Sequence, residues 1–261
     1  MFGLGKFTAR LAEGEDDLRR CQQLRWLTFR AAREDGVDGQ AAIGSRLDAD
    51  EFDERCWHMM VECARTGQLV CTFRMQEFEN GASIERSYAA KFYELSALQA
   101  YPGRMLEMGR FCIHPEWRDP NILRVAWTAM NEFVERRAVK LLFGCSSFSG
   151  VDDGVYEDAF ALLKEKHLAP KRWLPRVKAP KVFRFAKQLR LKKPDLKLAM
   201  RRMPPLLRTY LVMGGWVSDH AVVDHDLNTL HVFTGVEVGR VPKNRIARLR
   251  ARNQAQGDAG A

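Results

Sequence analysis

The sequence has no apolar run that approaches the ~20 residues a helix needs to cross a bilayer. Its first residues also lack the apolar stretch of a secretory signal peptide, so we expect a cytoplasmic protein. The six cysteines form no C-x-x-C pair, and most of them lie in or beside apolar segments. Their spacing argues against a zinc site or a disulfide framework and favours free, largely buried thiols.

A recognisable metal motif is missing too. Residues 219–231 are rich in histidine and aspartate, but their spacing matches no metal-binding pattern, and satisfied or exposed side chains are the simpler interpretation. No Ser/His/Asp or Cys/His set stands out either, and cysteines in buried strands are usually inert. We therefore predict no metal ion and no covalent catalytic intermediate.

Charge is abundant but unevenly distributed. Residues 1–163 hold 20 basic and 26 acidic side chains, whereas residues 164–208 hold 16 basic and 2 acidic ones. An acidic-leaning body followed by a basic segment predicts an anionic partner, and nucleic acid, an anionic membrane surface or an acidic carrier protein would each fit. A merely solvated face is the plain alternative, but the basic excess is larger than solubility requires.

Apolar periodicity and capping residues predict the regular elements. Helices are expected at 15–33, 121–137, 151–163 and 204–213. Strands are expected at 58–63, 69–75, 105–113, 140–148 and 182–185, with extended segments at 216–223 and 230–238. Strands followed by a strand–helix–strand–helix unit predict a mixed α/β domain with a crossover. The polar stretch 34–54 reads as a loop of a length typical of functional segments.

The strand expected at 105–113 carries Glu107 and Arg110 within an apolar run. Buried charges are costly unless they are paired, so the two residues form either a structural ion pair or part of a catalytic site. A regular strand would send them to opposite faces, because their spacing is odd. An irregularity at Gly109 would bring them to one side and would free a backbone N–H for a ligand.

Two further segments are candidates for binding. Asp50 and Asp53 lie in the acidic stretch 47–54 and could hold a cationic substrate, although a solvated acidic loop is the plainer interpretation. Residues 118–121 lead into a predicted helix, whose N-terminus could hold a phosphate. An ordinary cap, with Asn121 as the capping residue, is the commoner arrangement.

The string from Glu107 to Arg118, E-x-G-R-F-C-I-H-P-x-x-R, resembles the signature of bacterial L-ornithine N-acyltransferases, relatives of the acyl-homoserine-lactone synthases. The resemblance also includes Leu24-Arg25, the loop 50–53, the strand 69–74, Phe92-Tyr93, and the segments 216–219 and 222–225. It implies an α/β, GNAT-like acyltransferase fold with a central mixed twisted β-sheet flanked by helices. The core would occupy 1–175, a basic C-terminal extension packed on or continuing the core 176–250, and a frayed tail 251–261.

The resemblance also implies roles for individual residues. Glu107 and Arg110 would be catalytic, with Glu107 as the general base that deprotonates the α-amine of ornithine. Asp50 or Asp53 would hold the side-chain ammonium, and Arg25 or Arg74 the carboxylate. The substrate-binding set is Arg25, Phe29, Asp50, Asp53 and Arg74. The slot for the acyl chain and pantetheine would be lined by Phe111, Cys112, Phe143, Cys145, Arg118 and Asn121.

By the same resemblance, the protein binds no cofactor of its own. The donor would be a 3-hydroxyacyl thioester on the phosphopantetheine of acyl carrier protein, and the product lyso-ornithine lipid. Residues 118–123 contain no glycine, where coenzyme A-dependent members carry a glycine-containing pyrophosphate loop, and this favours the carrier protein over coenzyme A. The carrier would dock on 164–208. We also expect peripheral contact with the anionic inner membrane face, and no nucleic acid.

Three alternatives remain open at the level of sequence. An acyl-homoserine-lactone synthase would use S-adenosylmethionine, but the chain beyond about residue 200 is longer than in that lineage. An N-acyltransferase for another amino acid, such as lysine or glutamine, would share the same chemistry. A basic protein that binds nucleic acid or membranes without catalysis is the non-enzymatic alternative.

Overall fold

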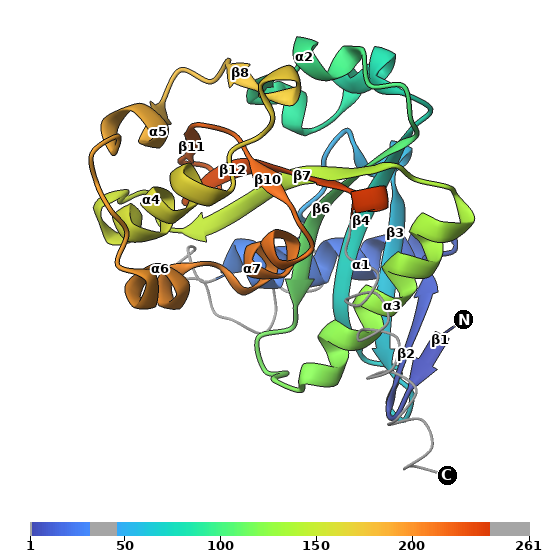
Figure 1. Cartoon of the computed structure of the whole chain (residues 1–261). Helices are drawn as coiled ribbons and strands as arrows, with labels where there is room; N and C mark the ends of the chain where they lie inside the picture. The colour runs from blue at the N-terminus through green and yellow to red at the C-terminus, as the bar shows by residue number, and fades with distance from the viewer. Residues whose placement is uncertain (1, 32–45, 241–261) are drawn as a thin grey trace. The chain divides into compact units, whose positions relative to one another are not determined.

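The computed structural model describes residues 2–31 and 46–240 (Figure 1). These residues divide into two compact units. Within the described residues, unit 1 comprises the chain up to Gln76 and Met108–Ala138, and unit 2 comprises Glu77–Glu107 and 139–240. The units alternate along the sequence, so the boundary expected at residue 175 lies inside unit 2. The predicted tail 251–261 lies outside the described residues.

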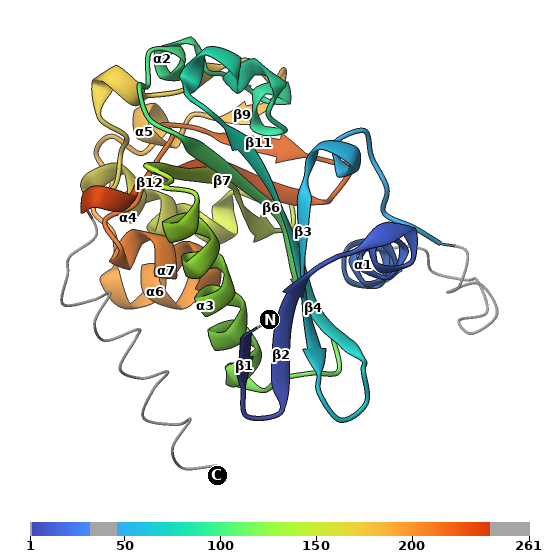
Figure 2. The same cartoon turned by 90° about the vertical axis from the view of Figure 1, so that its right-hand side faces the viewer.

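Unit 1 is built on antiparallel strands. β1 (Phe2–Leu4), β2 (Phe7–Leu11), β3 (Trp57–Cys63) and β4 (Leu69–Phe78) pair in sequence order. α1 (Gly14–Phe29) and α3 (Pro120–Arg136) lie on opposite faces of these strands (Figure 2). The face toward α1 holds a small apolar cluster of Cys21, Leu24, Met60, Leu69 and Cys112. Burial of the apolar side chains of α1 in this cluster holds the helix against the strands, while its other face stays in contact with water.

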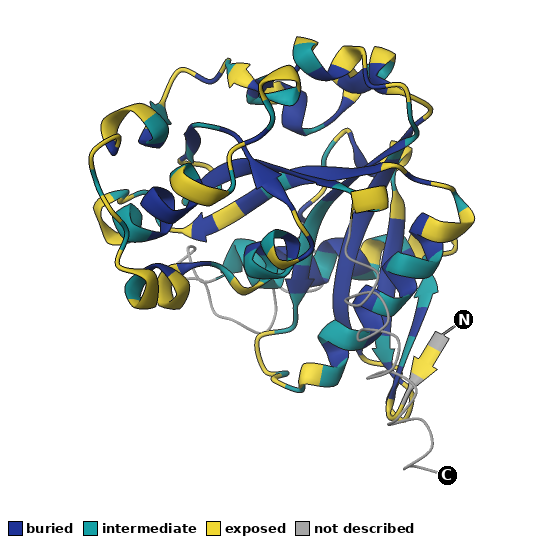
Figure 3. Ribbon diagram, viewed as in Figure 1, coloured by how far each residue is buried: buried dark blue, intermediate teal, exposed yellow. Residues whose placement is uncertain are grey.

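Unit 2 contains a mixed sheet. The first residues of β6 (Met105–Ile113) run parallel to β7 (Leu141–Ser149), which pairs antiparallel with β12 (Thr229–Glu237) along its whole length. β12 also pairs with β10 (Trp216–Val217) and β11 (Ala221–Asp224), and β11 pairs with β9 (Val182–Phe183). These strands are largely buried (Figure 3). Mixed pairing with flanking helices confirms the predicted α/β class.

The remaining elements of unit 2 are short. They are η4 (Gly81–Arg86), η5 (Ala89–Lys91), α2 (Ser96–Gln99), η6 (Gly154–Tyr156), α4 (Glu157–Lys166), η7 (Lys171–Trp173), α5 (Phe185–Gln188), α6 (Leu196–Arg202), α7 (Pro205–Val212) and η8 (Val238–Arg240). A two-stranded ladder of β5 (Tyr93–Glu94) and β8 (Arg176–Val177) joins the η5 segment to the start of the basic region. In unit 1, η3 (Asp53–Arg55) precedes β3. No helix of the described residues is both long and apolar enough to cross a membrane.

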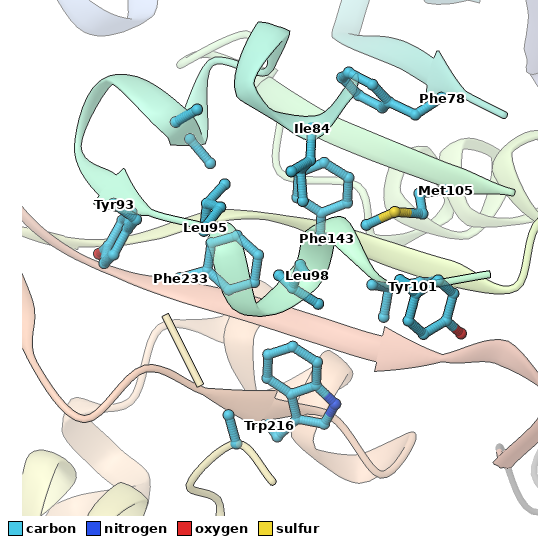
Figure 4. Packing of buried hydrophobic residues seen from close by; sticks show 14 of the residues in the cluster. Phe78, Ile84, Tyr93, Leu95, Leu98, Tyr101, Met105, Phe143, Trp216 and Phe233 are labelled. Carbon is cyan, nitrogen blue, oxygen red and sulfur yellow. The ribbon is translucent and has the colours of Figure 1, made fainter. Parts of the chain in front are cut away.

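The core of unit 2 is aromatic (Figure 4). The Phe143 and Trp216 rings each stack on the Phe233 ring, with centroid distances of 5.7 and 5.9 Å. Gly235 makes this arrangement possible, because a Cβ at that position would lie 2.4 Å from the Trp216 indole. Aromatic pairs of this kind stabilise the fold beyond the area they bury.

Several sequence predictions need correction. The helix predicted at 15–33 ends at Phe29, and the one predicted at 121–137 begins at Pro120, with the Asp119 side chain as its cap in place of Asn121. The strand predicted to reach Phe185 stops at Phe183, because Phe185 is buried as the first residue of α5. Residues 176–240, which were expected to pack on or continue the core, belong to unit 2 and contribute strands to its sheet.

Candidate functional site

Five of the predicted site residues of unit 1 meet in one charged cluster. α1 supplies Arg25, the loop before η3 supplies Asp50 and η3 itself supplies Asp53, β4 supplies Arg74 and β6 supplies Arg110. The cluster lies on the α1 side of the strands, because Arg25 of α1 bonds directly to Asp53. His58 of β3 lies opposite Arg74 of β4, and its ring contacts the Asp53 backbone carbonyl at 3.0 Å. The alternative of a solvated acidic loop does not hold for Asp53, which is buried.

Arg25 is the centre of the cluster and is only 1% exposed. Its Nε donates to Asp48 Oδ2 at 2.9 Å, and its Nη1 donates to Asp53 Oδ1 at 2.7 Å. Its Nη2 donates to the backbone carbonyl of Asp48. The amide of Gln22, one turn earlier on α1, donates to Asp53 at 2.9 Å. Arg25 and Asp53 therefore hold each other, and their charges are satisfied within the protein.

Asp48 and Gln22 were not among the predicted site residues. Asp48 is 2% exposed and also pairs with Arg30 at 3.0 Å. Its membership of the acidic stretch 47–54 was the available signal, but the sequence does not show which acids of a loop turn inward. Gln22 precedes Arg25 by three residues, a spacing that places both on one helix face.

Arg74 and Arg110 complete the cluster around Asp50. Arg74 donates to Asp50 Oδ2 at 2.9 Å and to Asp53 Oδ1 at 2.8 Å, and its guanidinium lies 5.5 Å from the centroid of the Phe52 ring. Arg110 forms ion pairs with Asp48 at 3.0 Å and with Asp50 at 3.4 Å. The Asp50 side chain is 24% exposed, in contrast to buried Asp48 and Asp53. Asp50 is thus the carboxylate of the cluster that a solute can reach.

Electrostatics keep the buried carboxylates ionised. Burial raises the pKa of Asp53, but the hydrogen bond and charge of Arg25 outweigh it and lower that pKa to about 2. Asp48 behaves alike: burial opposes ionisation, yet the charges of Arg110 and Arg25 bring its pKa below the usual value. Because an unpaired buried charge is costly, the arginines and aspartates depend on one another.

The strand β6 is irregular next to Gly109, as predicted. Arg110 has a φ of +53°, a left-handed conformation that is uncommon for a residue with a side chain. Such a residue costs about 1–3 kcal/mol and persists only where its surroundings impose it. Here the ion pairs of the Arg110 guanidinium with Asp48 and Asp50 supply that constraint.

Glu107 belongs to unit 2 and is 5% exposed. Its Oε2 accepts a hydrogen bond from the Tyr88 backbone N–H at 2.8 Å, and its Oε1 accepts one from the Ala89 N–H at 2.7 Å. Both oxygens are therefore oriented by main-chain donors at the start of η5. The carboxylate is held rigidly and could act as a base only in this orientation.

The predicted slot residues are divided between the units. Phe111 stacks on Phe73 with centroids 5.3 Å apart, and Cys112 lies in the apolar cluster beside α1, where half-buried Phe29 also packs. Phe143 lies in the core of unit 2, with partly buried Cys145 packed against it. Burial raises the pKa of Cys112 to about 12, so its thiol stays protonated and is a poor nucleophile.

The last two slot residues lie at the start of α3. Arg118 is exposed, and the Asn121 backbone N–H donates to the Asp119 carboxylate at 2.9 Å. Asp119 also pairs with Lys6 at 3.0 Å. The helix N-terminus is therefore occupied by an ordinary acidic cap, which would repel a phosphate from this position.

The histidine-rich segment contributes to the core of unit 2. His231 is 2% exposed, and the Tyr93 hydroxyl donates to its carbonyl at 2.8 Å. His220 is fully buried, with its Nδ1 2.7 Å from Asp219 Oδ1. Among the described residues, no group of His, Cys, Asp and Glu side chains could hold a metal ion.

His231 should make stability depend on pH. Burial lowers its pKa from 6.5 to about 4. The unfolded chain then binds the proton more tightly, so the free energy of unfolding is highest above pH 6.5 and falls, by up to about 3 kcal/mol, as the pH drops toward 4. Urea unfolding at several pH values measures this loss. A His231→Gln variant should lose less stability over that interval than the unmutated protein, whereas exposed His225→Gln should follow the unmutated protein; equal slopes for both variants would contradict the prediction.

This chain is similar to a known protein family and to named relatives. Residues 24–128 match the acetyltransferase (GNAT) domain. The chain is 31% identical over 232 residues to the L-ornithine N(alpha)-acyltransferase of Rhodobacter capsulatus, covering 87% of this chain and 88% of that protein. It is 28% identical over 254 residues to the Brucella abortus protein of the same name, with 94% and 89% covered.

Among solved structures, the coenzyme A-dependent acyl-homoserine lactone synthase BjaI superposes with a TM-score of 0.50. The two chains are 13% identical, and the match covers 97% of this chain and 90% of that one. At this identity the likeness concerns the fold, and it agrees with the mixed sheet and flanking helices described above.

Proposed function

This chain belongs to the L-ornithine N(alpha)-acyltransferase family, and on that basis we propose that it transfers a 3-hydroxyacyl group from acyl carrier protein to the α-amine of L-ornithine. It is an N-acyltransferase with a GNAT-like fold. The structural observation that carries the choice of acceptor is Asp50, a partly exposed carboxylate held between two arginines at the edge of a buried charged cluster. The product would be lyso-ornithine lipid.

Ornithine carries a carboxylate and a second ammonium, and the cluster offers both complementary charges. Asp50 binds the side-chain ammonium, because it is the accessible carboxylate of the cluster. Arg74 and Arg110 flank it and are the ligands for the ornithine carboxylate. Arg25 and Asp53 are saturated by buried partners, so they support the site instead of binding substrate.

The reaction needs a neutral amine. Glu107 accepts the proton of the α-ammonium directly or through a water molecule, and its burial and fixed orientation support this role. The amine then attacks the thioester carbonyl, and a backbone N–H beside the left-handed Arg110 stabilises the oxyanion. As the C–S bond breaks, the amide forms and the pantetheine thiolate leaves and is protonated. No cysteine of the enzyme takes part.

The carrier protein docks on residues 171–184, which belong to the basic segment 164–208 and are here called its first part. This part adjoins the segment that orients Glu107: Lys178 Nζ donates to the Ala90 carbonyl at 2.6 Å, and the Ala179 N–H donates to the Phe92 carbonyl at 3.0 Å. Lys171, Lys181 and Arg184 are exposed there. Their charges would attract an acidic carrier and bring its thioester toward η5.

A thiol-release assay tests the proposed function. The protein is incubated with a 3-hydroxyacyl carrier protein and one amino acid at a time, and the free pantetheine thiol is followed. We expect release that depends on L-ornithine. Release that requires S-adenosylmethionine would instead identify a lactone synthase. Release with lysine or glutamine but not with ornithine would mean a different acceptor, and no release with any of these would refute the proposal.

Replacing Asp50 by asparagine should raise KM for ornithine by about 10–100-fold with a smaller change in kcat. The reason is that a charge-assisted hydrogen bond to the ammonium contributes about 1.5–3 kcal/mol. Steady-state kinetics at saturating carrier protein measures both constants. Glu54→Gln, an exposed acid of the same segment, is the control and should leave both constants unchanged. An unaltered KM in Asp50→Asn would remove Asp50 from the acceptor site.

Reversing three exposed charges of residues 171–184 should raise KM for the carrier protein at least about tenfold at low salt. The triple variant carries Lys171→Glu, Lys181→Glu and Arg184→Glu. The effect should shrink as salt is added, because exposed charges are screened. The matched control is the same charge reversal at Lys193, Lys197 and Arg201, which lie farther along the chain. Equal effects of the two triple variants would show that only the overall charge matters.

A further inference from the structure

Three of the most exposed large apolar side chains lie close together in the sequence of unit 2. Leu191 is 85% exposed, Leu196 52% and Met200 43%. Leu191 lies in the turn between α5 and α6, and the other two lie on α6, most of which is exposed (Figure 3). A single exposed leucine is ordinary on a protein surface, but a group of apolar side chains marks an interaction site.

The geometry of α6 explains why these side chains face water. At about 100° per residue, Ala199 and Met203 share one side of the helix, and Leu196 and Met200 follow directly beside them. Ala199 and Met203 are buried in the core of unit 2. The apolar arc of α6 is therefore wider than the part that the core covers, and its outer half stays exposed.

Basic side chains surround this arc. The exposed ones are Arg190, Lys193, Lys197, Arg201 and Arg202. Together with Leu191, Leu196 and Met200 they are called the α6 patch. Asp195 is the one acid of residues 187–202, and its carboxylate caps α6 by accepting from the Leu198 N–H at 3.0 Å.

The α6 patch has a firm base. The Asp195 N–H donates to the Asp158 carboxylate of α4 at 2.9 Å, and Lys192 pairs with Glu157 at 2.8 Å. Lys192 thus turns toward α4, while the basic residues of the patch are exposed to solvent. Leu196 and Met200 are therefore presented by an anchored helix, and Leu191 by the turn before it, whose Leu189 and Lys192 carbonyls accept hydrogen bonds from Lys164.

We propose that the α6 patch binds the surface of an anionic phospholipid membrane, with Leu191, Leu196 and Met200 inserted between the headgroups. A membrane interface offers an anionic layer above an apolar interior, and an amphipathic helix edged by lysine and arginine matches both. An acidic protein or a nucleic acid would satisfy the charges but leave the protruding Leu191 without a function. The proposal goes beyond the proposed acyl transfer and does not depend on it.

Vesicle flotation tests the proposal with the full chain. The protein is mixed with vesicles of phosphatidylcholine alone or of phosphatidylcholine with phosphatidylglycerol, and the floated fraction is measured. We expect binding to the anionic vesicles, weakened by salt, and little binding to the neutral ones. The triple variant Leu191→Ser, Leu196→Ser and Met200→Ser should bind anionic vesicles at least about tenfold more weakly. A variant with Lys193, Lys197 and Arg201 changed to glutamine should lose binding to a similar extent.

Controls separate this surface from the rest of the basic region. The glutamine changes at Lys171, Lys181 and Arg184 remove the same charge and should leave most vesicle binding intact. Thermal unfolding of each variant should match that of the unmutated protein, because all the substituted side chains are exposed. Absence of binding to anionic vesicles, or unchanged binding by the serine variant, would overturn the proposal.

Two other occupants give distinct results. If the serine variant floats normally but no longer binds immobilised acyl carrier protein, the α6 patch is a carrier-docking surface and the proposal is wrong. If the unmutated protein is a dimer that the serine changes dissociate while flotation is unaltered, the patch is an interface between two copies. Thiol release from carrier protein in solution reports on the proposed activity separately, since it requires no vesicles.

Discussion

Replacing Arg25 by methionine is expected to lower the free energy of unfolding by about 3–5 kcal/mol, which is the usual effect of removing one partner from a buried ion pair. Arg25 is 1% exposed and bonds to both Asp48 and Asp53. Without it, two buried carboxylates keep their charge but lose their central donor. Urea unfolding of the variant and of the unmutated protein gives the difference directly.

Arg30→Met is the matched control. Arg30 also pairs with Asp48, at 3.0 Å, but its side chain is 33% exposed. Removing it should cost less than about 1 kcal/mol, because Arg30 is partly solvated and buried Asp48 keeps its ion pairs with Arg25 and Arg110. If Arg25→Met unfolds as the unmutated protein does, the charged cluster is not the support of the site that we infer.

Replacing Glu107 by glutamine is expected to lower kcat by about 100-fold or more, since a positioned general base contributes about 10²–10⁴-fold. Glutamine has nearly the same shape but cannot take up the proton of the amine. The rate should be measured at several pH values with saturating ornithine and carrier protein. The variant should also lose the part of the pH dependence that the base imposes.

A purely structural role for Glu107 gives a different result. Its two oxygens accept the Tyr88 and Ala89 N–H groups, and glutamine can accept only one of them. If Glu107 merely holds η5, the variant should unfold at a lower temperature and keep its kcat when assayed well below that temperature. Full kcat in the folded variant at every pH would exclude Glu107 as the base, whereas a large loss of kcat in a stable variant supports it.

The sequence alone identified the residue types of the site. The odd spacing of Glu107 and Arg110, with Gly109 between them, predicted an irregular strand, and the left-handed backbone at Arg110 confirms it. The resemblance named Arg25, Asp50, Asp53 and Arg74 together, and these four do lie in one cluster. The long strands were also predictable, because their apolar runs are set by local composition.

Other features could not be predicted from local pattern. The short elements β1, β2, α5 and α6 depend on what packs beside them: Phe185 begins a helix because the core of unit 2 buries it. Local pattern does not show which acids of a loop face inward, so it neither singles out Asp48 nor shows that Asp53 pairs with Arg25. Whether these side chains are buried is decided by their partners from distant segments of the chain.

For Glu107 and Arg110, composition and spacing determined that two charges would stand in one apolar strand. Only the tertiary structure decided what each one meets. Arg110 reaches the aspartates of a loop some sixty residues earlier, and Glu107 receives two backbone N–H groups of η5. The free-energy cost of burying a charge is larger than the local conformational preference of a strand. Each charge is therefore stabilised by partners from elsewhere in the fold.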